Sequence, residues 1–382
     1  MNETGKLVKQ RSTWLLVDLI RVCDYFWLQL EMLQQCRFGA NCYRKKNAKH
    51  MARYSHNNEE NQSDPFKTDE DRHAIEKRPK LDYLHDLQII DELFLVKHSN
   101  DIIKFWEHAI AVAGESEARN AFKSLDCLRL EGVFDYLAQG NENNKDASEN
   151  YWIISCRYET DLPEMETFAT CSSGRFAFWR DTPECDTPLI VFVAKQMKHF
   201  PKLEIVGTSD PTYILLYLMT ETCKTKRYLT LLPEGWSRRM SAYETERRKW
   251  NAARRKTSLG HNSHGMGIVV KVTDDVGYRP LGISQAELKK KIEDISSCSD
   301  EVMKNARKES LVDIFSNVQF ANDEMDFGMG LEFGHELFMS NYCDVDRMAV
   351  SVLTTAYTLL ERSAFAKILK AHTDVRRKHP SE

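Results

Sequence analysis

The sequence has 382 residues, of which 42% are hydrophobic and 29% are charged. These fractions are close to those of soluble globular domains, so they exclude wholesale disorder, a collagen-like chain and a long coiled coil. The formal net charge of −4 excludes a polycationic coat for nucleic acid but says nothing about local patches. At roughly 100–200 residues per domain, the length predicts about two folded domains.

The longest apolar run, residues 14–33, does not predict a membrane span. Four charged residues interrupt it, whereas a spanning helix needs about 20 largely apolar residues. The run also lacks the small-residue cleavage site of a signal peptide. Ten cysteines without close regular pairing fit reduced thiols better than a disulfide framework. We therefore expect an intracellular protein with no membrane partner.

Two segments of different character lie within the first 80 residues. Residues 12–33 place apolar side chains at helical spacing, which predicts an amphipathic docking helix within an N-terminal segment of residues 1–34. Residues 58–80 hold seven acids, five bases and two large apolar side chains, which predicts a disordered linker. The linker ends in Lys77-Arg78-Pro79-Lys80, which fits a nuclear import signal but is a common kind of cluster.

Between these segments, residues 35–57 contain two cysteines and two histidines at C-x5-C-x7-H-x5-H spacing. The four residues are Cys36, Cys42, His50 and His56. Two thiolates and two imidazoles are ligands that tetrahedral Zn²⁺ takes, and so short a stretch folds only if the metal replaces a core. Chance clustering is the alternative. Six bases and no acid lie within residues 34–58, so this module should attract polyanions.

The same segment resembles the poly(ADP-ribose)-binding zinc finger. The similarity lies in Cys36-Arg37-Phe38-Gly39 and Cys42-Tyr43-Arg44-Lys45, followed by the two histidines. In that family the aromatic residue and the arginine after the second cysteine hold an adenine of the polymer. The resemblance therefore implies poly(ADP-ribose) binding by Tyr43 and Arg44, with Phe38 lining the site. The chain departs from the family pattern by one extra residue before the first histidine and by two missing prolines.

Residues 81–235 predict the first half of a larger α+β body. A helix is expected from Asn100 or Asp101, with Gly114 as its stop. Short β-rich runs follow and together predict a small antiparallel sheet with flanking helices. The runs are residues 151–155, 167–170, 175–179, 189–193 and 204–206. Asp210-Pro211 then begins another helix.

Residues 236–375 predict a mainly helical second half. Helical periodicity covers residues 284–315 and 345–371, and residues 267–272 predict a strand. In the last helix the side chains expected to face inward are Met348, Val352, Thr355, Leu359, Leu360, Ile368 and Leu369. Residues 236–256 hold eight bases against two acids. A solvated helix face is one interpretation, and a patch for nucleic acid or an acidic partner is the other.

Residues 318–336 contain five acids and no base. The adjacent carboxylates of Asp323 and Glu324 repel each other, and in a partly dry cleft this repulsion would make one of them basic enough for general-base catalysis. Three glycines follow, but their G-x-G-x-x-x-G spacing and the surrounding acids exclude a dinucleotide-binding loop. An acidic turn packed by apolar side chains is the alternative interpretation. Those side chains are Phe320, Phe327 and Leu331.

This acidic segment, together with several others, resembles the histone poly(ADP-ribosyl)ation factor family. The similarity extends over roughly residues 85–370 and includes residues 158–192, 264–270 and 275–279 and the helix around Phe105-Trp106. Members of that family bind the catalytic domain of DNA-damage-activated poly(ADP-ribose) polymerases. They complete its active site and direct transfer to serine, notably on histones. The resemblance thus implies that NAD is bound by the partner polymerase and not by this chain.

Carried over by position, the resemblance also implies residue roles. Glu324 would accept the proton of the acceptor serine, which suits a weak nucleophile that needs a base. Asp323 would orient the acceptor or bind the polymerase. Tyr278 and Arg279 would help to hold the interface, and Arg279 could also pair with Asp323 within the chain.

Three functional hypotheses follow. The first is a nuclear accessory factor, at chromatin near DNA damage, whose partners are a polymerase, histones and poly(ADP-ribose) and whose finger binds zinc. The second is a poly(ADP-ribose)-reading chromatin adaptor without a catalytic contribution. The third is an independent hydrolase that uses Asp323 and Glu324. It has the least support, because the sequence reveals no metal set and no second, separated acid.

Overall fold

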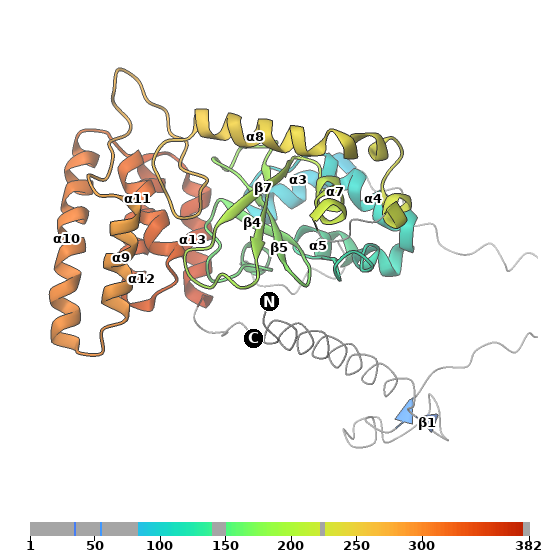
Figure 1. Cartoon of the computed structure of the whole chain (residues 1–382), viewed down its shortest axis with the longest axis horizontal. Helices are drawn as coiled ribbons and strands as arrows, with labels where there is room; N and C mark the ends of the chain where they lie inside the picture. Colours follow the sequence, from blue (N-terminus) through green and yellow to red (C-terminus); the bar gives the residue numbers. More distant parts are fainter. Residues whose placement is uncertain (1–33, 36–53, 56–82, 140–149, 222–225, 377–382) are drawn as a thin grey trace, which may run out of the picture. The chain divides into compact units, whose positions relative to one another are not determined.

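The computed structural model describes residues 34–35, 54–55, 83–139, 150–221 and 226–376 (Figure 1). The chain divides into two compact units, residues 1–79 and 80–382. In the first unit, strands β1 (Gln34–Gln35) and β2 (Tyr54–Ser55) pair in parallel. The predicted helix of residues 12–33, the zinc-finger side chains and the linker of residues 58–80 lie outside the described residues.

A five-stranded antiparallel sheet forms the middle of the second unit, as the sequence predicts. Its strands lie side by side in chain order. They are β3 (Arg129–Leu130), β4 (Met165–Thr170), β5 (Gly174–Trp179), β6 (Leu189–Ala194) and β7 (Leu203–Thr208). Strand β3 has no counterpart among the predicted runs, because two residues are too short to display an alternating pattern.

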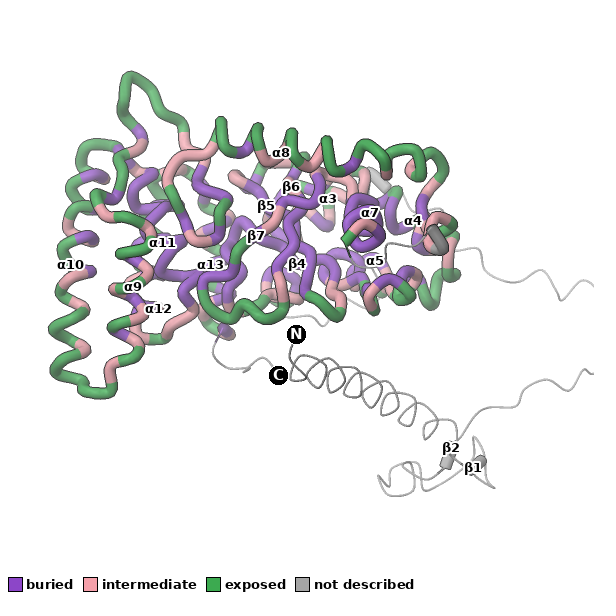
Figure 2. The backbone as a smooth tube through the Cα atoms, viewed as in Figure 1, coloured by how far each residue is buried: buried purple, intermediate pink, exposed green. Residues whose placement is uncertain are grey.

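Both faces of this sheet are covered, so β5 is buried along its whole length (Figure 2). Successive side chains of a strand point to opposite faces. Phe178 stacks on Phe168 of β4 at a ring distance of 4.1 Å, and Phe168 contacts Phe134 of α5 (Val133–Gln139). On the other face, the rings of Trp179 and His335 meet edge to face. Each such aromatic side chain contributes about 1.5–3 kcal/mol by leaving water.

Helices that precede, interrupt and directly follow the strands in the chain accompany the sheet. They are α3 (Tyr83–Phe94), α4 (Asp101–Ala113), α5, α6 (Tyr151–Ile154), α7 (Thr212–Glu221) and α8 (Tyr243–Thr257), with 3₁₀ turns at η3 (Glu115–Asn120), η5 (Lys226–Leu231) and η6 (Trp236–Ser241). The predicted helix α4 is confirmed, and it ends at Gly114, whose φ is +81°. Ser99 supplies its N-terminal hydrogen bond, because its Oγ accepts from the Asp101 N–H at 3.1 Å.

After a non-helical segment at residues 258–284, the described chain is mostly helical, which confirms the predicted α+β class with a mostly helical C-terminal part (Figure 1). Its helices are α9 (Gln285–Ser296), α10 (Glu301–Asp323), α11 (Gly328–Met339), α12 (Cys343–Leu359) and α13 (Ser363–Val375). Helix α11 packs against both α10 and α12. Within the described residues, no helix is both long and apolar enough to cross a membrane.

Two of the predicted strands are wrong. Residues 151–155 form helix α6, whose Trp152 and Ile153 are buried. A four-residue apolar run has no period that separates strand from helix, so its packing decides. Residues 267–272 form no strand either. They make a single bridge in which Ile268 pairs with Leu259.

The predicted helix of residues 345–371 is interrupted. Helices α12 and α13 are separated by a turn in which Glu361 has a φ of +59° and the Arg362 N–H donates to the Tyr357 carbonyl at 2.8 Å. Of the side chains expected to face inward, Val352, Ile368 and Leu369 are buried. Thr355 and Leu359 are exposed and Met348 and Leu360 are half-buried, because the two helices do not share one continuous face.

Candidate functional site

The adjacent carboxylates lie where helix α10 ends. Asp323 is the last helical residue, and the Glu324 N–H still donates to the carbonyls of Phe320 and Ala321, both at 3.2 Å. The chain then reverses at Met325, whose φ is +67°, and the Asp326 N–H donates to the Ala321 carbonyl at 2.8 Å. Asp323 and Glu324 are therefore presented on a hydrogen-bonded helix end.

A second loop, residues 275–279, docks onto this helix end. The buried Asp326 accepts the Gly277 N–H at 2.9 Å, and the Gly328 N–H donates to the Gly277 carbonyl at 2.9 Å. Gly277 has a φ of +129°, and a Cβ there would lie 2.2 Å from the Lys271 carbonyl oxygen. Only glycine fits this position, so the loop is held tightly beside the carboxylates.

Arg279 lies at the end of this loop and reaches two carboxylates. Its Nη2 forms an ion pair with Asp326 at 3.1 Å and a shorter one with Glu324. The hydrogen bond to Glu324 raises the pKa of Arg279 above its ordinary value. The predicted pairing of Arg279 with Asp323 is wrong, because Arg279 pairs with Glu324 and Asp326 instead. Within the described part of the chain, the side chain of Asp323 has no hydrogen bond or ion pair.

Tyr278 anchors the loop to helix α11. Its hydroxyl donates to Oε2 of the buried Glu332 at 2.9 Å, and Oε1 of Glu332 accepts the His261 N–H at 2.7 Å. Burial, followed by the Glu332 charge, raises the pKa of the Tyr278 phenol well above its ordinary value. The phenol is therefore a neutral donor that positions the loop.

The three buried acids of the segment are structural. Glu336, one helical turn after Glu332, accepts the Ser263 N–H at 2.8 Å, and burial raises the pKa of its carboxyl. Asp326, Glu332 and Glu336 thus tie residues 261–263 and 277–279 to helix α11. Sequence reasoning missed these roles. The i, i+4 spacing of Glu332 and Glu336, which places both on one helical face, was the available signal.

The two remaining acids face solvent. The side chain of Glu324 is 59% exposed, so this chain alone does not supply the partly dry cleft considered for general-base catalysis from the sequence. Two large apolar side chains flank it: Phe320 is 63% exposed and Met325 is 60% exposed. The alternative of a packed acidic turn holds only for Leu331, which is buried, and in part for Phe327.

The glycines after the acidic turn serve packing, in agreement with the rejection of a dinucleotide loop. A Cβ on Gly328 would lie 2.9 Å from the Val270 side chain, and one on Gly334 would lie 2.5 Å from the Leu353 side chain. Helix α11 therefore approaches its neighbours more closely than a larger residue would allow.

Two of the eight bases in residues 236–256 form ion pairs inside the fold. Arg254 contacts both carboxylate oxygens of Asp181, at 2.5 and 2.8 Å, and Arg247 pairs with Glu204 at 2.6 Å. Neither interpretation of this segment, a solvated helix face or a patch for an anionic partner, describes Arg247 and Arg254. These two arginines are structural, while Arg238, Lys249, Arg255 and Lys256 are exposed and have no ion pair in the part of the chain that is described.

The predicted finger residues belong to the first unit. Cys36, Cys42, His50 and His56 lie outside the described residues, as do Phe38, Tyr43 and Arg44. The paired strands β1 and β2 bracket most of this segment. Among the described residues, no group of three or more His, Cys, Asp or Glu side chains is arranged to hold a metal ion.

Comparison with known proteins assigns the second unit. A family model described as Histone PARylation factor 1 matches residues 86–376, well over half of the chain. The chain belongs to this family. A second model, described as PBZ domain, matches residues 33–59 and covers all seven predicted finger residues. The predicted family resemblances are therefore both confirmed.

Curated relatives carry the same family name. A Danio rerio protein named histone PARylation factor 1 is 28% identical over 296 residues, which cover 74% of this chain and 83% of the relative. The Bos taurus protein of that name is 30% identical over 286 residues, covering 71% of this chain and 81% of the relative. The Mus musculus protein is 28% identical over 297 residues, covering 74% and 84%.

Proposed function

We propose that this chain is an accessory factor that binds the catalytic domain of a poly(ADP-ribose) polymerase and directs ADP-ribosylation to serine. The partner binds NAD, and this chain contributes Glu324 as the general base. The acceptors are serines of histones and other proteins, and the setting is chromatin in the nucleus at sites of DNA damage. The observation that carries the proposal is the exposed Glu324, presented on a rigid helix end within a chain of the histone PARylation factor 1 family.

The chemistry suits an exposed carboxylate that a partner covers. A serine hydroxyl attacks the ribose carbon of NAD as the bond to nicotinamide breaks, and its proton passes to Glu324. Covering a carboxylate with a partner surface makes it a stronger base. The free chain leaves Glu324 accessible, and docking of the polymerase would supply the water-excluding wall.

The surroundings of Glu324 support a docking surface. Phe320 and Met325 offer apolar area on either side of it, and large exposed apolar groups of this kind mark contact sites. Arg279 and Tyr278 hold the adjacent loop, and Arg279 also holds the Glu324 carboxylate until a partner competes for it. Asp323, which has no described partner of its own, is free to orient the acceptor or to bind the polymerase.

The N-terminal unit supports a second attachment. The PBZ match covers Cys36, Cys42, His50 and His56, whose thiolates and imidazoles suit Zn²⁺. Phe38, Tyr43 and Arg44 would then hold an adenine of poly(ADP-ribose). A finger bound to existing polymer would raise the effective concentration of the factor where the polymer is made. Zinc analysis of the full chain tests this part: loss of bound zinc in Cys42→Ala is expected, and a wild-type chain without zinc contradicts it.

Reconstitution tests the catalytic part. A polymerase, NAD, a histone peptide and this chain are combined, and serine-linked ADP-ribose is measured by mass spectrometry. Glu324→Gln should reduce serine transfer by about 10²–10⁴-fold, the usual contribution of a general base, while complex formation persists. Glu309→Gln, an exposed glutamate on the same helix, is the matched control and should retain full transfer. Full transfer by Glu324→Gln would refute the assignment.

A second candidate function rests on the PBZ match alone. In this function the chain is a poly(ADP-ribose)-reading chromatin adaptor, and the acidic turn has no catalytic role. Unchanged serine transfer in Glu324→Gln, combined with polymer binding that is lost in Cys42→Ala, would favour the adaptor. Loss of polymer without any polymerase would instead favour a hydrolase.

A further inference from the structure

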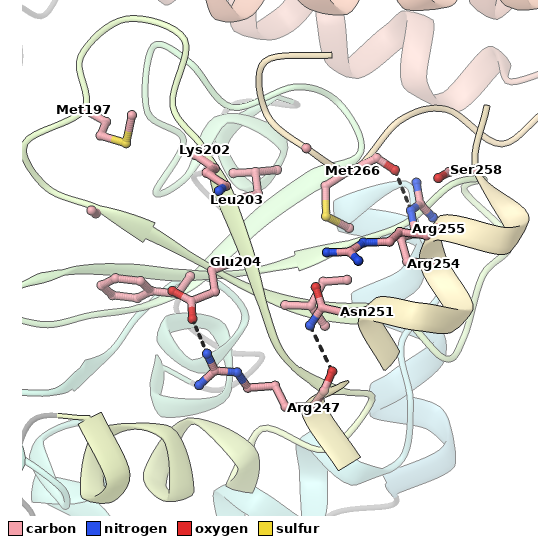
Figure 3. Close-up of a pocket in the computed structure, with 14 residues that line it drawn as sticks. Met197, Lys202, Leu203, Glu204, Arg247, Asn251, Arg254, Arg255, Ser258 and Met266 are labelled. Carbon is pink, nitrogen blue, oxygen red and sulfur yellow. Dashed lines mark hydrogen bonds and ion pairs between the residues drawn. The ribbon is translucent and has the colours of Figure 1, made fainter. Parts of the chain in front are cut away.

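A basic cleft lies between the edge strand β7 and helix α8, away from the acidic turn in the sequence. It has a volume of about 570 Å³, and Gly265 and Met266 are among its lining residues. Figure 3 shows its labelled side chains. A smaller hollow of about 380 Å³ adjoins it, and the two share Phe192 and Ala194 at the end of β6. Lys195 lines the smaller hollow, and the two adjoining hollows are together called the groove.

The cations of this groove are of two kinds. Arg247 and Arg254 are held by Glu204 and Asp181, so they shape the wall but are already neutralised. Lys195, Lys202 and Arg255 are exposed, and within the described residues none of the three has an ion pair. Lys202 lies at the β7 wall and Arg255 at the α8 wall (Figure 3).

Among the described residues that line the groove, Glu204 is the one acid, and both of its oxygens already accept hydrogen bonds from the protein. One accepts from Arg247 at 2.6 Å and the other from the Tyr217 hydroxyl at 3.2 Å. The groove therefore carries a surplus of positive charge in a concave site, where an anionic ligand is favoured.

Apolar side chains also line the groove. Met197 is 39% exposed and lies in the main cleft, whereas Met266 is 1% exposed and Phe192, which lines both hollows, is 8% exposed. Flat rings pack well against methionine and aromatic side chains. A ligand that carries both anionic groups and flat rings can use the exposed cations and the exposed Met197 together. A duplex DNA backbone, by contrast, presents a row of phosphates without rings, and an acidic peptide leaves the methionine surface unused.

We propose that this groove binds poly(ADP-ribose), with one pyrophosphate between Lys202 and Arg255, an adenine against the exposed Met197, and the next unit toward Lys195. The inference rests on the proposed function in one respect, since a polymerase bound to the same chain would supply the polymer. It differs from the predicted finger, because its residues all lie in the second unit. The groove would retain the factor on growing chains after transfer to serine has begun.

Binding of defined-length poly(ADP-ribose) to the full chain tests the proposal, with fluorescence anisotropy as the measurement. Every protein carries Cys42→Ala, so that the finger does not contribute. Lys202→Glu with Arg255→Glu should weaken binding about 30-fold, as expected for the loss of two exposed ion pairs of about 1 kcal/mol each. Arg238→Glu with Lys249→Glu changes the net charge equally outside the groove and should weaken binding less than about threefold. Circular dichroism verifies that both variants are folded.

Three results would overturn the proposal. Equal weakening in the two double variants would mean non-specific attraction to basic charge. Failure of the Cys42→Ala chain to bind the polymer would mean that the groove is no binding site. Tighter binding of oligo-glutamate or duplex DNA than of polymer would assign the groove to another ligand. No polymerase or NAD is present in this assay, so its outcome is independent of the serine-transfer test of Glu324.

Discussion

Asp326 is the residue that joins the two parts of the acidic site. Its carboxylate accepts the Gly277 N–H at 2.9 Å with one oxygen and pairs with Arg279 at 3.1 Å with the other. Arg279 in turn contacts Glu324. A buried carboxylate thus fixes the loop whose arginine determines where the exposed carboxylate lies.

We expect Asp326→Ala to detach this loop. The substitution leaves the buried Gly277 N–H unpaired, which costs about 1–3 kcal/mol of unfolding free energy. Asp326→Asn keeps an acceptor for Gly277 but loses the charge that holds Arg279. Urea unfolding should therefore rank wild type above Asn and Asn above Ala, and affinity for the polymerase should fall in both. An Ala variant as stable as wild type would show that Asp326 does not carry the loop.

The residue scale also sets a limit on what the sequence can predict. Asp323, Glu324 and Asp326 are all acidic and lie within four positions, yet of the three only Asp326 is buried. The burial of Asp326 depends on residues 275–279, about fifty positions earlier in the chain. The local sequence pattern around Asp326 therefore cannot predict it. The error in the partner of Arg279 has the same origin. A shift of one residue at a helix end turns the side chain by about 100°.

At the scale of elements, helix α11 shows how closely neighbours can pack. A Cβ on Gly334 would meet the Leu353 side chain at 2.5 Å, whereas one on Gly330 would meet the Val318 side chain at 3.3 Å. The first contact requires the Leu353 side chain or the two helices to shift. The second needs an adjustment of a few tenths of an ångström.

These two glycines form a matched pair of substitutions. Replacing a helical glycine by alanine gains up to about 1 kcal/mol of helix propensity. At Gly334 the clash with Leu353 should exceed this gain, so Gly334→Ala is expected to lose about 1–3 kcal/mol. At Gly330 the two effects nearly cancel, and Gly330→Ala should lie within about 1 kcal/mol of wild type. Urea denaturation of both variants measures the difference, and equal stabilities would contradict the packing argument.

Elements were predictable where their signals are local. The periodicity of α4 and its stop at Gly114 gave its limits, and turns separated four strands of the sheet correctly. The failures have tertiary causes. Helix α6 is defined by packing against α3 and α13, and the break between α12 and α13 uses Glu361 at positive φ, where glycine would have been the usual signal.

At the scale of the second unit, buried polar contacts connect its sheet half to its helical half. Glu164, just before β4, accepts from the Tyr357 hydroxyl of α12 at 2.7 Å and contacts Nε2 of His335 in α11 at 3.0 Å. Asp181, just after β5, holds Arg254 of α8. The sequence suggested halves of residues 81–235 and 236–375, and these contacts all cross that division. We infer that the two halves unfold together.

Tyr357→Phe tests this inference. The change removes the donor to Glu164 and leaves one oxygen of a buried carboxylate unpaired, which costs about 1–3 kcal/mol. Of the five tryptophans in the second unit, Trp106, Trp152 and Trp179 belong to the first half, and Trp236 and Trp250 both pack on Tyr213 of that half, so their fluorescence reports mainly on the sheet and its neighbours. Circular dichroism at 222 nm is dominated by the helices of the second half. If the halves are coupled, the variant lowers the urea midpoint of both signals equally, because unfolding is a single transition.

Tyr342→Phe is the control for that experiment, since its hydroxyl has no hydrogen bond in the described structure and its loss should change stability by less than about 0.5 kcal/mol. A shift in the circular dichroism signal alone would contradict the inference. The helical half would then unfold separately, and Glu324 would rest on a unit that forms without the sheet. Coincident shifts instead mean that the position of Glu324 depends on packing as distant as Glu164, because the acidic turn and the sheet share one cooperative core.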